Sequence, residues 1–304
     1  VLRDWHVDAV AAQFTPFMTW RGAGRAGTYG PVRTVNGASD PEIALPAGGD
    51  CRLRLLNCDT TRIMRIGIEG ADASIIAVDG IAIVPTPLRL WTLGPAMRLD
   101  VIVRAPHGSG IARLVDRSNS ERIVLARFVG HGAPLRRSRF APAPLRAGRI
   151  REPDLAAATP LEFTFHASDA GALVASAYDP NGGALGDLCT SARTFWGINN
   201  QAWPERGHSR LPLPLAVLQR GGSYLFRLKN RSQFSHPIHI HGHTFKVLRS
   251  NQQNRPVHYA DTVVLLPEEQ VEVAFVADNP GDWMFHCHVI EHQETGMMGY
   301  LRVV

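Results

Sequence analysis

The sequence predicts an all-β protein built from sandwiches, and three observations support this fold class. Short runs in which apolar and polar residues alternate recur along the chain, which is the pattern of half-buried strands. Glycine-containing turn signals separate these runs, as at residues 181–183 (NGG), 220–222 (RGG) and 279–282 (NPGD). Sustained helical periodicity does not occur. Many short strands with turns between them are typical of β-sandwiches.

The expected strands fall into two groups along the chain. We place them at residues 52–56, 98–103, 122–128, 161–165, 224–228, 262–266 and 271–276. Residues 130–160 are rich in Pro, Ala and Arg and lack alternation, which favours a boundary there. A chain of 304 residues with 45% hydrophobic content is long enough for two cores. We therefore expect domains at 1–135 and 161–304, joined by a linker at 136–160.

The net charge of +5 comes almost entirely from arginine, because Lys229 and Lys246 are the only lysines. The arginines are spread over strands and loops, apart from a brief cluster at residues 136–139 that we interpret as a solvated linker. A nucleic-acid partner is therefore not expected. Runs of 18 or more apolar residues do not occur, so the sequence predicts no membrane span.

Four cysteines are present, and Cys287 lies among histidines. Cys51 and Cys58 are seven positions apart in an apparently extended segment. This spacing would separate them by roughly 20 Å and turn them to opposite faces, too far for a disulfide. Cys189 could pair with one of them or with another domain, or it could remain a buried free thiol. The disulfide pairing therefore stays open.

The C-terminal region concentrates possible metal ligands. His286-Cys287-His288 is followed by His292 and Met297, so one thiolate, three imidazoles and a thioether lie within twelve residues. A thiolate with two imidazoles and a weak axial thioether is the ligand set of a type 1 copper, whereas zinc prefers a closed tetrahedron of Cys and His. The missing imidazole is expected from a second cluster at residues 236–243, HPIHIHGH.

Strand geometry sorts these donors into two sites. Neighbouring side chains on a strand face opposite ways, so Cys287 points to one side and the histidines next to it point to the other. By the same count His239 and His241 share a face, and His236 falls on the opposite one. The predicted mononuclear site consists of His236, Cys287, His292 and Met297. The predicted second site consists of His239, His241, His286 and His288.

The two clusters resemble the copper signatures of a known family. HPIHIHGHTF at 236–245 and HCHVIEHQETGMM at 286–298 are similar to the two C-terminal motifs of the multicopper oxidases, the laccase and copper-efflux oxidase family. The resemblance implies two tandem cupredoxin-like Greek-key β-sandwiches and copper as the cofactor. It also implies a role for each donor: type 1 for His236, Cys287, His292 and Met297, type 2 for His239, and type 3 for His241, His286 and His288.

The remaining histidines have no expected role in copper binding. His243 is not a ligand in the family pattern. The others stand alone in the sequence, and a lone histidine is more often a packed or surface group than a ligand. They are His6, His107, His131, His166, His208 and His258.

The first half of the chain resembles the family more loosely. The opening VLRDW and the phrases TVNG at 34–37, CRLRLLNC at 51–58 and IAVDG at 76–80 are similar to the second domain of three-domain members. Such members hold a trinuclear copper centre with eight histidines, four of them in two His-x-His pairs of the first domain. Such a pair does not occur before His239 here. We therefore expect domains 2 and 3, with an N-terminal cupredoxin domain as the missing partner.

The resemblance implies an oxidase that uses dioxygen. Electrons would leave a small reducing substrate at the type 1 copper near His292 and pass through Cys287 to His286 and His288, and four electrons would reduce dioxygen to water. We favour phenols or aromatic amines as substrates. Cuprous-ion oxidation is often accompanied by Met-rich segments, and this chain has six Met without a cluster beyond 297–298. Because bacterial members are mostly periplasmic or secreted, we expect that location.

Three alternatives define what else the motifs could serve. A cuprous or other metal-ion oxidase uses the same copper signatures. A type 1-only electron carrier has no use for the second set of histidines. A copper nitrite reductase places one His beside the type 1 Cys rather than one on each side, so the His-Cys-His run argues against it.

Gln293 is a departure from the family pattern. Many bacterial members carry Glu at this position, where it is thought to assist proton delivery, and an amide cannot exchange protons as a carboxylate does. Glu294 could substitute only if it faced inward, which strand parity does not favour. The sequence therefore leaves the proton route open.

Overall fold

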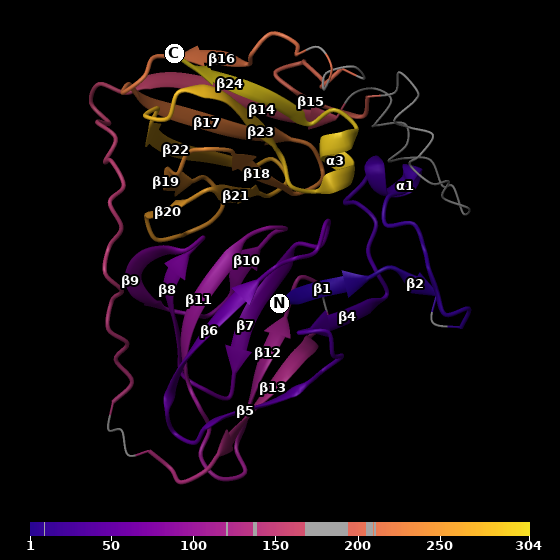
Figure 1. Cartoon of the computed structure of the whole chain (residues 1–304), viewed down its shortest axis with the longest axis vertical. Coiled ribbons are helices and arrows are strands. Elements are labelled where there is room, and N and C mark those ends of the chain that lie inside the picture. The colour runs from indigo at the N-terminus through magenta and orange to yellow at the C-terminus, as the bar shows by residue number, and fades with distance from the viewer. Residues whose placement is uncertain (9, 120, 136–138, 168–193, 205–208, 210) are drawn as a thin grey trace. The chain divides into compact units, whose positions relative to one another are not determined.

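The computed structural model describes residues 1–8, 10–119, 121–135, 139–167, 194–204, 209 and 211–304. The chain divides into two compact units: unit 1 comprises Val1–Phe14 and Gly30–Gly148, and unit 2 comprises Thr15–Tyr29 and Arg149–Val304. Nearly all regular structure in both units is β-strand (Figure 1). The predicted all-β fold class is therefore confirmed.

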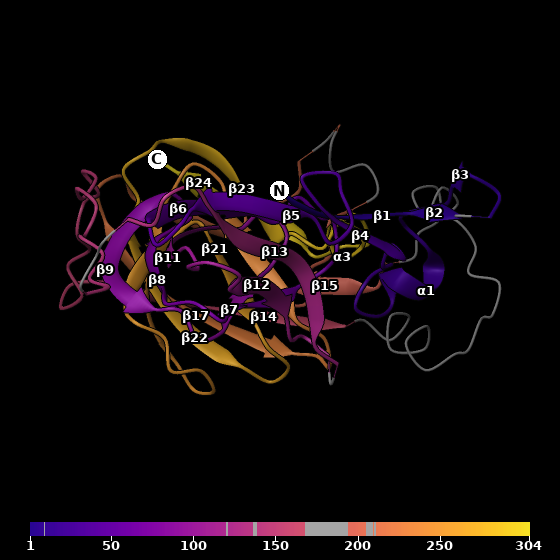
Figure 2. The same cartoon turned by 90° about the horizontal axis from the view of Figure 1, so that it is seen from below.

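Unit 1 is a two-sheet sandwich. Its strands are β1 (Leu2–Trp5), β2 (Val7–Asp8), β3 (Gln13–Phe14), β4 (Val32–Val35), β5 (Glu42–Pro46), β6 (Asp50–Leu56), β7 (Met64–Glu69), β8 (Ala73–Val78), β9 (Ile81–Pro87), β10 (Trp91–Leu93), β11 (Arg98–Arg104), β12 (Ile111–Asp116) and β13 (Ile123–His131). One sheet has the order β10-β7-β12-β13-β5 and the other β6-β11-β8-β9. Two short ribbons pair β1 with β4 and β2 with β3, the latter at the end of β1 (Figure 2).

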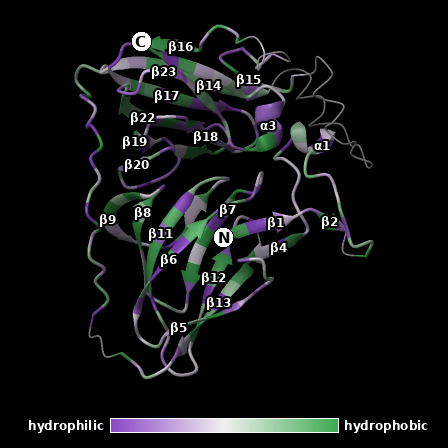
Figure 3. Ribbon diagram, in the orientation of Figure 1, coloured by the Kyte–Doolittle hydropathy of each residue, from purple (hydrophilic) through white to green (hydrophobic). Residues whose placement is uncertain are grey.

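The strands of unit 1 form because their apolar residues recur at the period of a pleated strand. On the central strand β11, Leu99, Val101 and Val103 are fully buried. The intervening Ile102 is partly exposed. Figure 3 shows apolar and polar residues interleaved along the strands. The apolar side chains between the two sheets make the core of this unit.

In its described residues, unit 2 is a second two-sheet sandwich with two short helices. Its elements are α1 (Trp20–Ala23), β14 (Thr159–Ala167), β15 (Trp196–Ile198), β16 (Ala216–Leu218), β17 (Ser223–Arg231), β18 (His236–Ile240), β19 (Phe245–Ser250), β20 (His258–Ala260), β21 (Thr262–Leu265), β22 (Gln270–Val276), β23 (Gly281–Cys287), α3 (Ile290–Glu294) and β24 (Met298–Val303). The sheet orders are β15-β14-β17-β22-β19-β20 and β16-β24-β23-β18-β21. Neighbours in each sheet are mostly distant in sequence, which requires crossing connections between the sheets.

An aromatic cluster fills the space between the sheets of unit 2. Phe163 of β14 lies with its ring centroid 4.7 Å from that of Phe226 on β17 and 5.1 Å from that of Phe285 on β23. All three side chains are at most 1% exposed. Because Phe285 points into this core, Cys287, two residues along the strand, points the same way. The core therefore sets which face of β23 is buried.

Each of the seven expected strand runs forms a strand, in β6, β11, β13, β14, β17, β21 and β22. The expected linear division at 136–160 differs from the compact units in one respect, because Thr15–Tyr29 belongs with the C-terminal half. This segment has no strand periodicity, and the side chain that holds it, Glu291, is far away in sequence. Local patterning therefore carries no sign of it.

Cys51, Cys58 and Cys287 are free thiols, so the expectation that Cys51 and Cys58 do not bridge is confirmed. Cys189, the turn at 181–183 and residues 136–138 of the arginine cluster lie outside the described residues. Among the described helices, none has the length and apolar character needed to cross a membrane.

Candidate metal centre

The donor residues lie on two neighbouring strands and one short helix, or within three residues of their ends. β18 and β23 pair antiparallel in the five-stranded sheet of unit 2, with Ile238 opposite Cys287 and His239 opposite His286. α3 follows β23 after two residues and carries His292, and β24 returns along β23. Residues opposite one another across a strand pair share a face. The pairing register therefore places His239 and His286 on one face of the sheet, and Cys287 on the other.

The core-facing side brings His236, Cys287 and His292 together. Their donor atoms all lie within 4.8 Å of one another. The Cys287 Sγ lies 3.8 Å from His236 Nδ1 and 3.7 Å from His292 Nδ1. All three side chains are 0% exposed. Among the described residues this is the one group of three or more His, Cys, Asp or Glu side chains arranged closely enough to share an ion.

Met297 is tied to this group through its backbone. Its N–H donates to the carbonyl of His292 at 2.8 Å, and its carbonyl accepts from the N–H of Cys287 at 3.1 Å. Its side chain is also 0% exposed. All four residues of the predicted mononuclear site are therefore buried in one region.

The tautomer of His292 is set by a backbone carbonyl. Its Nε2 lies 2.5 Å from the carbonyl oxygen of Arg25, in the Thr15–Tyr29 segment. A carbonyl only accepts, so the Nε2 carries the proton and donates. The Nδ1 that faces Cys287 then holds a free lone pair. An imidazole that binds a metal through one ring nitrogen usually donates a hydrogen bond from the other nitrogen, and His292 has this arrangement.

A side-chain relay sets the tautomer of His236 in the same way. Its Nε2 lies 2.8 Å from the hydroxyl of Ser232, and that hydroxyl donates to the Asn230 Oδ1 at 2.9 Å. The amide of Asn230 is oriented because its Nδ2 donates to the carbonyls of Phe234 and Leu266. With its one proton directed at Asn230, Ser232 accepts from His236. The Nδ1 of His236 is thereby also a free acceptor.

Burial keeps the two imidazoles neutral and the thiol protonated when no ion compensates them. It lowers the pKa of His292 to about 4, and it lowers that of His236 well below its usual range, with the nearby His292 adding to the effect. Burial also raises the pKa of the Cys287 thiol. A divalent ion would favour loss of that proton. Two imidazole acceptors, a thiol and a thioether, all enclosed, fit the soft and borderline donors that copper takes.

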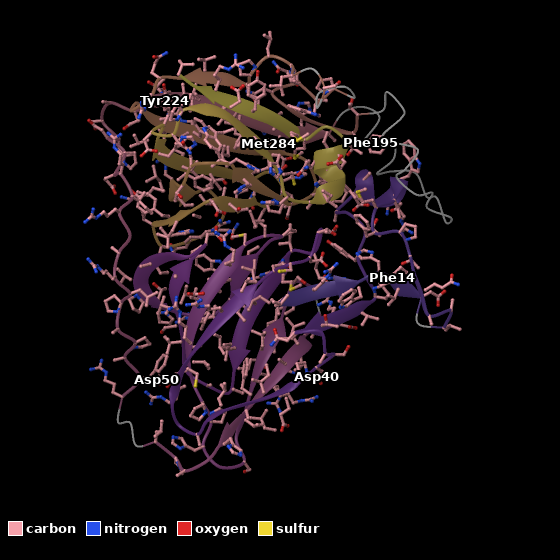
Figure 4. The ribbon with its side chains drawn as sticks, viewed as in Figure 1. Phe14, Asp40, Asp50, Phe195, Tyr224 and Met284 are labelled. Carbon is pink, nitrogen blue, oxygen red and sulfur yellow. The ribbon has the colours of Figure 1, made fainter. Side chains whose placement is uncertain are left out.

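The ring of Trp196, on β15, packs against the imidazole rings of both His236 and His292. Its ring centroid lies 4.5 Å from that of His292 and 5.0 Å from that of His236. The indole Nε1 donates to the carbonyl of Ala23 at 2.6 Å. Phe195, the preceding residue, lies beside α3 (Figure 4) and packs on Trp20 with 5.6 Å between ring centroids. These contacts fix the rings of both histidines from one side.

Glu291 fastens the Thr15–Tyr29 segment to α3. Its carboxylate accepts from the backbone N–H of Thr19 at 2.9 Å, from the hydroxyl of Thr28 at 2.6 Å and from the backbone N–H of Thr28. The side chain is 0% exposed, and burial raises its pKa although the three donors act in the opposite direction. The segment thus held supplies both carbonyls, of Ala23 and Arg25, that contact Trp196 and His292.

The other face of the same strands gathers the second set of histidines: His239, His241, His286 and His288. The Nε2 atoms of His241 and His286 lie 3.0 Å apart. The ring centroids of His239 and His288 lie 4.7 Å apart, and those of His286 and His288 lie 4.9 Å apart. Their donor atoms do not converge on one point as tightly as those of the buried group. The four residues nevertheless form one cluster of imidazoles.

Hydrogen bonds again orient rings in this cluster. His239 Nδ1 donates to the carbonyl of Asp261 at 2.8 Å, and His286 Nδ1 donates to the carbonyl of Cys287 at 2.8 Å. Both Nε2 atoms are left as acceptors. Burial, with the neighbouring imidazoles, lowers the pKa of His286 to about 4 and of His288 to about 3. The rings of His286 and His288 are therefore neutral, and able to act as metal ligands, above about pH 5.

The structure thus brings together both sets of donors that the motifs singled out, and the ligand roles themselves remain predictions. His243 lies outside both sets and packs on Phe275 and Trp283. The isolated His6, His107, His131, His166 and His258 join neither cluster, and His208 lies outside the described residues. Glu294 is exposed and accepts from Gln293 at 3.1 Å, so it does not face inward.

Sequence reasoning missed Trp196, Ser232, Glu291 and the Thr15–Tyr29 segment. A short NRS phrase at 230–232 and an acidic residue directly before His292 were the available signals. Neither signal indicates a supporting role until the fold shows which residues it contacts. These residues support the donors through contacts between segments as much as 272 positions apart in the chain.

Comparisons with known proteins agree with the motifs. Two family models, both described as "Multicopper oxidase", match residues 1–111 and 185–304. The structure superimposes on a multi-copper oxidase from Pseudomonas thermotolerans with a TM-score of 0.84 and 39% identity, covering 100% of this chain and 66% of that one. For a multi-copper oxidase from Pseudomonas parafulva the TM-score is 0.81 with 37% identity, covering 99% of this chain and 67% of that one.

A curated relative gives the same answer. The chain is 30% identical over 255 residues to the multicopper oxidase MmcO of Mycobacterium tuberculosis, which covers 82% of this chain and 45% of the relative. The chain thus spans about half the length of that relative. Both sandwiches have the cupredoxin-like fold of these enzymes. The chain therefore belongs to the multicopper oxidase family, and its cofactor is copper.

Proposed function

We propose that the complete protein is a laccase-like oxidase that removes one electron at a time from phenols or aromatic amines and uses four electrons to reduce dioxygen to two waters. The observation that carries this proposal is the end of β23, where Cys287 joins the buried group while its two neighbours, His286 on the strand and His288 directly after it, join the imidazole cluster on the other face. One strand thus connects two donor sets through adjacent peptide bonds. That arrangement suits transfer of electrons from one centre to another.

Residues of this chain would bind copper at both centres. His236, Cys287, His292 and Met297 would hold a type 1 copper, because the hydrogen bonds of both imidazoles leave Nδ1 free and directed at the sulfur. His239 would serve a type 2 copper, and His241, His286 and His288 would serve a type 3 pair. Copper held by a thiolate, two imidazoles and a thioether supplies one-electron redox chemistry. Burial of the first group excludes water from it.

Cys287 offers a second connection between the two faces besides the covalent one. Its carbonyl accepts a hydrogen bond from the Nδ1 of His286 at 2.8 Å. The link joins the residue that carries the sulfur to a ring of the outer cluster. It also fixes the His286 ring so that its Nε2 lies 3.0 Å from that of His241.

An N-terminal cupredoxin domain would complete the outer cluster. Family members use eight histidines at the trinuclear centre, and this chain offers four. The missing four would come from the two His-x-His pairs of that domain, which we propose as the partner of this chain. The outer histidines other than His286 are partly exposed in unit 2, which suits a cluster completed by another domain.

The substrate that donates electrons could be an organic molecule or a metal ion. Proteins matched by this chain include one named "Laccase-3" from Thanatephorus cucumeris and one named "Iron multicopper oxidase fer1" from Mycosarcoma maydis. The second name makes a metal-ion donor the alternative candidate. We favour organic donors over cuprous ions because the sequence has no methionine-rich segment. We also propose a periplasmic or secreted location, which fractionation of the source cells would test.

The test uses full-length protein loaded with copper. We expect about four coppers per chain, blue absorption that is lost in Cys287→Ser, and uptake of one dioxygen per four molecules of a phenol oxidised. A content of one copper without dioxygen uptake would identify an electron carrier instead. Turnover with Fe²⁺ or Cu⁺ but with no phenol or aromatic amine would favour the metal-ion alternative.

A further inference from the structure

Residues 19–28 form a compact loop whose two ends touch. The hydroxyl oxygens of Thr19 and Thr28 lie 2.7 Å apart, and the backbone N–H groups of both residues donate to the carboxylate of Glu291 on α3. Between them lies α1, which Thr19 caps by accepting from the N–H of Gly22 at 2.9 Å. α1 lies next to α3 (Figure 1). A compact loop with touching ends is an Ω-loop, and we call residues 19–28 the capping loop.

The capping loop covers His292. The Nε2–H of His292 donates to the carbonyl of Arg25 at 2.5 Å. The ring of Trp196, whose centroid lies 4.5 Å from that of His292, is held by its own N–H, which donates to the carbonyl of Ala23 at 2.6 Å. The side chain of His292 is 0% exposed. The loop backbone therefore covers the Nε2 edge of the imidazole directly and one of its faces through Trp196.

The backbone of the capping loop is held close to α3. The N–H of Arg25 donates to the carbonyl of Gly22 at 2.9 Å. Gly22 lies so near to α3 that a Cβ added to it would stand 2.2 Å from a carboxylate oxygen of Glu291. Glycine permits this close approach because it has no Cβ. The carbonyl of Arg25 is thus tied to α3 through Gly22, and it leaves His292 only if the loop moves away from α3.

These contacts restrict what an electron donor can do at His292. A neutral imidazole has one N–H, and here that N–H is already bonded to a backbone carbonyl. The oxygen of a phenol or the nitrogen of an aromatic amine could accept from it only by displacing Arg25. Residues 25–28 are partly exposed, so a donor can still approach the loop from solvent. Transfer of an electron, unlike transfer of a proton, does not require the donor to touch the acceptor.

We propose that the capping loop keeps the donor off His292, so that electrons cross the backbone at Arg25 and donors are selected by reduction potential rather than by their fit to the imidazole. The proposal rests on the oxidase function above. The donors it favours lose an electron without bonding to the protein, as do phenols, aromatic amines and metal complexes with a full set of ligands. Each donor loses one electron to the oxidised protein. A phenol also loses its hydroxyl proton to solvent, which leaves a phenoxyl radical.

The first test measures hydrogen exchange in copper-loaded full-length protein. The copper is reduced with dithionite, so that an added donor cannot be oxidised and the diamagnetic Cu⁺ leaves the NMR signals sharp. The His292 Nε2–H and the Trp196 Nε1–H are assigned by their absence from His292→Gln and Trp196→Phe. Both should exchange with D2O over minutes to hours, because exchange requires the loop to open. Addition of 2,6-dimethoxyphenol should leave the His292 signal unshifted.

Two results of this experiment would overturn the proposal. One is exchange of the His292 Nε2–H within the dead time of the measurement, which would mean that the imidazole is open to solvent. The other is a shift of its signal that saturates as the phenol is added, which would mean that the donor contacts the ring.

Thr28→Val tests whether the closed base of the loop provides this protection. It removes the hydroxyl that joins Thr19 to Glu291 and keeps the branched shape of the side chain. Loss of a hydrogen bond to a charged group should make opening about 10–100-fold more frequent, and both N–H groups should exchange faster by that factor. Thr86→Val is the matched control, since its hydroxyl donates to the carbonyl of Val84 on β9. Equal exchange in the two variants would refute the role of the loop.

A shortened loop tests the route of the electron. Two glycines replace residues 20–27, which is feasible because Thr19 and Thr28 are in contact. Reduction is followed without dioxygen by bleaching of the blue band, with 2,6-dimethoxyphenol and with hexacyanoferrate(II), whose iron already has six ligands. Only the phenol gains a hydrogen bond to the uncovered imidazole, so the ratio of its rate to that of hexacyanoferrate(II) should rise about 2–10-fold. An unchanged ratio would refute the proposal, and Thr28→Val decides the question if the shortened protein does not fold.

These measurements separate the capping loop from the oxidase function. Slow N–H exchange together with no bleaching by phenols or aromatic amines would refute the oxidase function and leave the loop assignment standing. Rapid exchange together with bleaching by these donors would refute the loop assignment and leave the oxidase function standing.

Discussion

Replacing Glu291 by Gln tests whether the contact between α3 and the Thr15–Tyr29 segment supports the metal centre. The carboxylate accepts three hydrogen bonds, and the amide that replaces it has a single acceptor oxygen. If that oxygen takes the place of Oε1, it keeps the contacts to Thr19 and to the Thr28 hydroxyl and loses the Thr28 N–H. A buried hydrogen bond to a charged group contributes about 1.5–3 kcal/mol.

The two contacts that remain are also weaker, because the acceptor is no longer charged, while the amide is less costly to bury than the carboxylate. We therefore expect a net loss of about 2–3 kcal/mol in the free energy of unfolding. In a domain of 150–250 residues each kcal/mol lowers Tm by about 2–4 °C, so Tm should fall by about 5–10 °C. The segment held by Glu291 carries the carbonyls that contact His292 and Trp196, so the blue absorption of the variant should disappear at the same lowered temperature.

The measurement is thermal unfolding of the copper-loaded full-length protein, followed by circular dichroism and by the blue absorption band. Glu294→Gln is the matched control, since Glu294 lies on the same helix and is exposed. We expect Glu291→Gln to lose the blue band at a lower temperature than wild type and the control to behave as wild type. If both variants melt like wild type, the reasoning about this contact is wrong.

Three further predictions follow from other contacts of unit 2. Ser232→Ala removes the acceptor for His236 Nε2–H and should weaken copper binding about 10–100-fold, measured by chelator competition. Gly22→Ala places a Cβ 2.2 Å from the buried carboxylate, 2.2 Å from the Thr28 hydroxyl and 2.7 Å from the backbone N of Thr28. It should cost about 1–3 kcal/mol of stability, whereas Gly148→Ala, with no atom within 4 Å of the added Cβ, should be neutral in the same urea titration. Burial lowers the pKa of His258 to about 4, from 6.5. The unfolded chain therefore binds this proton more readily, and about 3 kcal/mol of stability should be lost as pH falls from 6.5 to 4. The check is the free energy of unfolding measured against pH for wild type and for His258→Gln. Equal slopes between pH 6.5 and pH 4 would contradict the prediction.

The sequence was sufficient for seven of the strands and for grouping the two donor sets, since both follow from the period of a pleated strand. Alternation identified these seven strands, and the same two-residue period put Cys287 and its neighbouring histidines on opposite faces. Those inferences need only local geometry. The spacing of histidines within the two motifs, at 236–243 and 286–298, then limited which histidines could join each set.

The supporting residues could not be found in this way. Ser232 acts because Asn230 is itself oriented by carbonyls that the fold brings to it, and Arg25 acts through its backbone, so its side chain carries no signal. The role of Glu291 depends on the Thr15–Tyr29 segment, which only the fold brings against it. Such contacts depend on tertiary packing, and no spacing rule along the chain encodes them.

The route of the chain between the units restricts how genes of this family can recombine. A crossover point in the stretch around 136–160 would look neutral, because it leaves all eight predicted copper ligands on one side. It would nevertheless separate His292 and Trp196 from the carbonyl acceptors that their native sequence provides at Arg25 and Ala23. Chimeras between relatives should therefore tolerate a breakpoint there only when residues 15–29 come from the same parent as the C-terminal half.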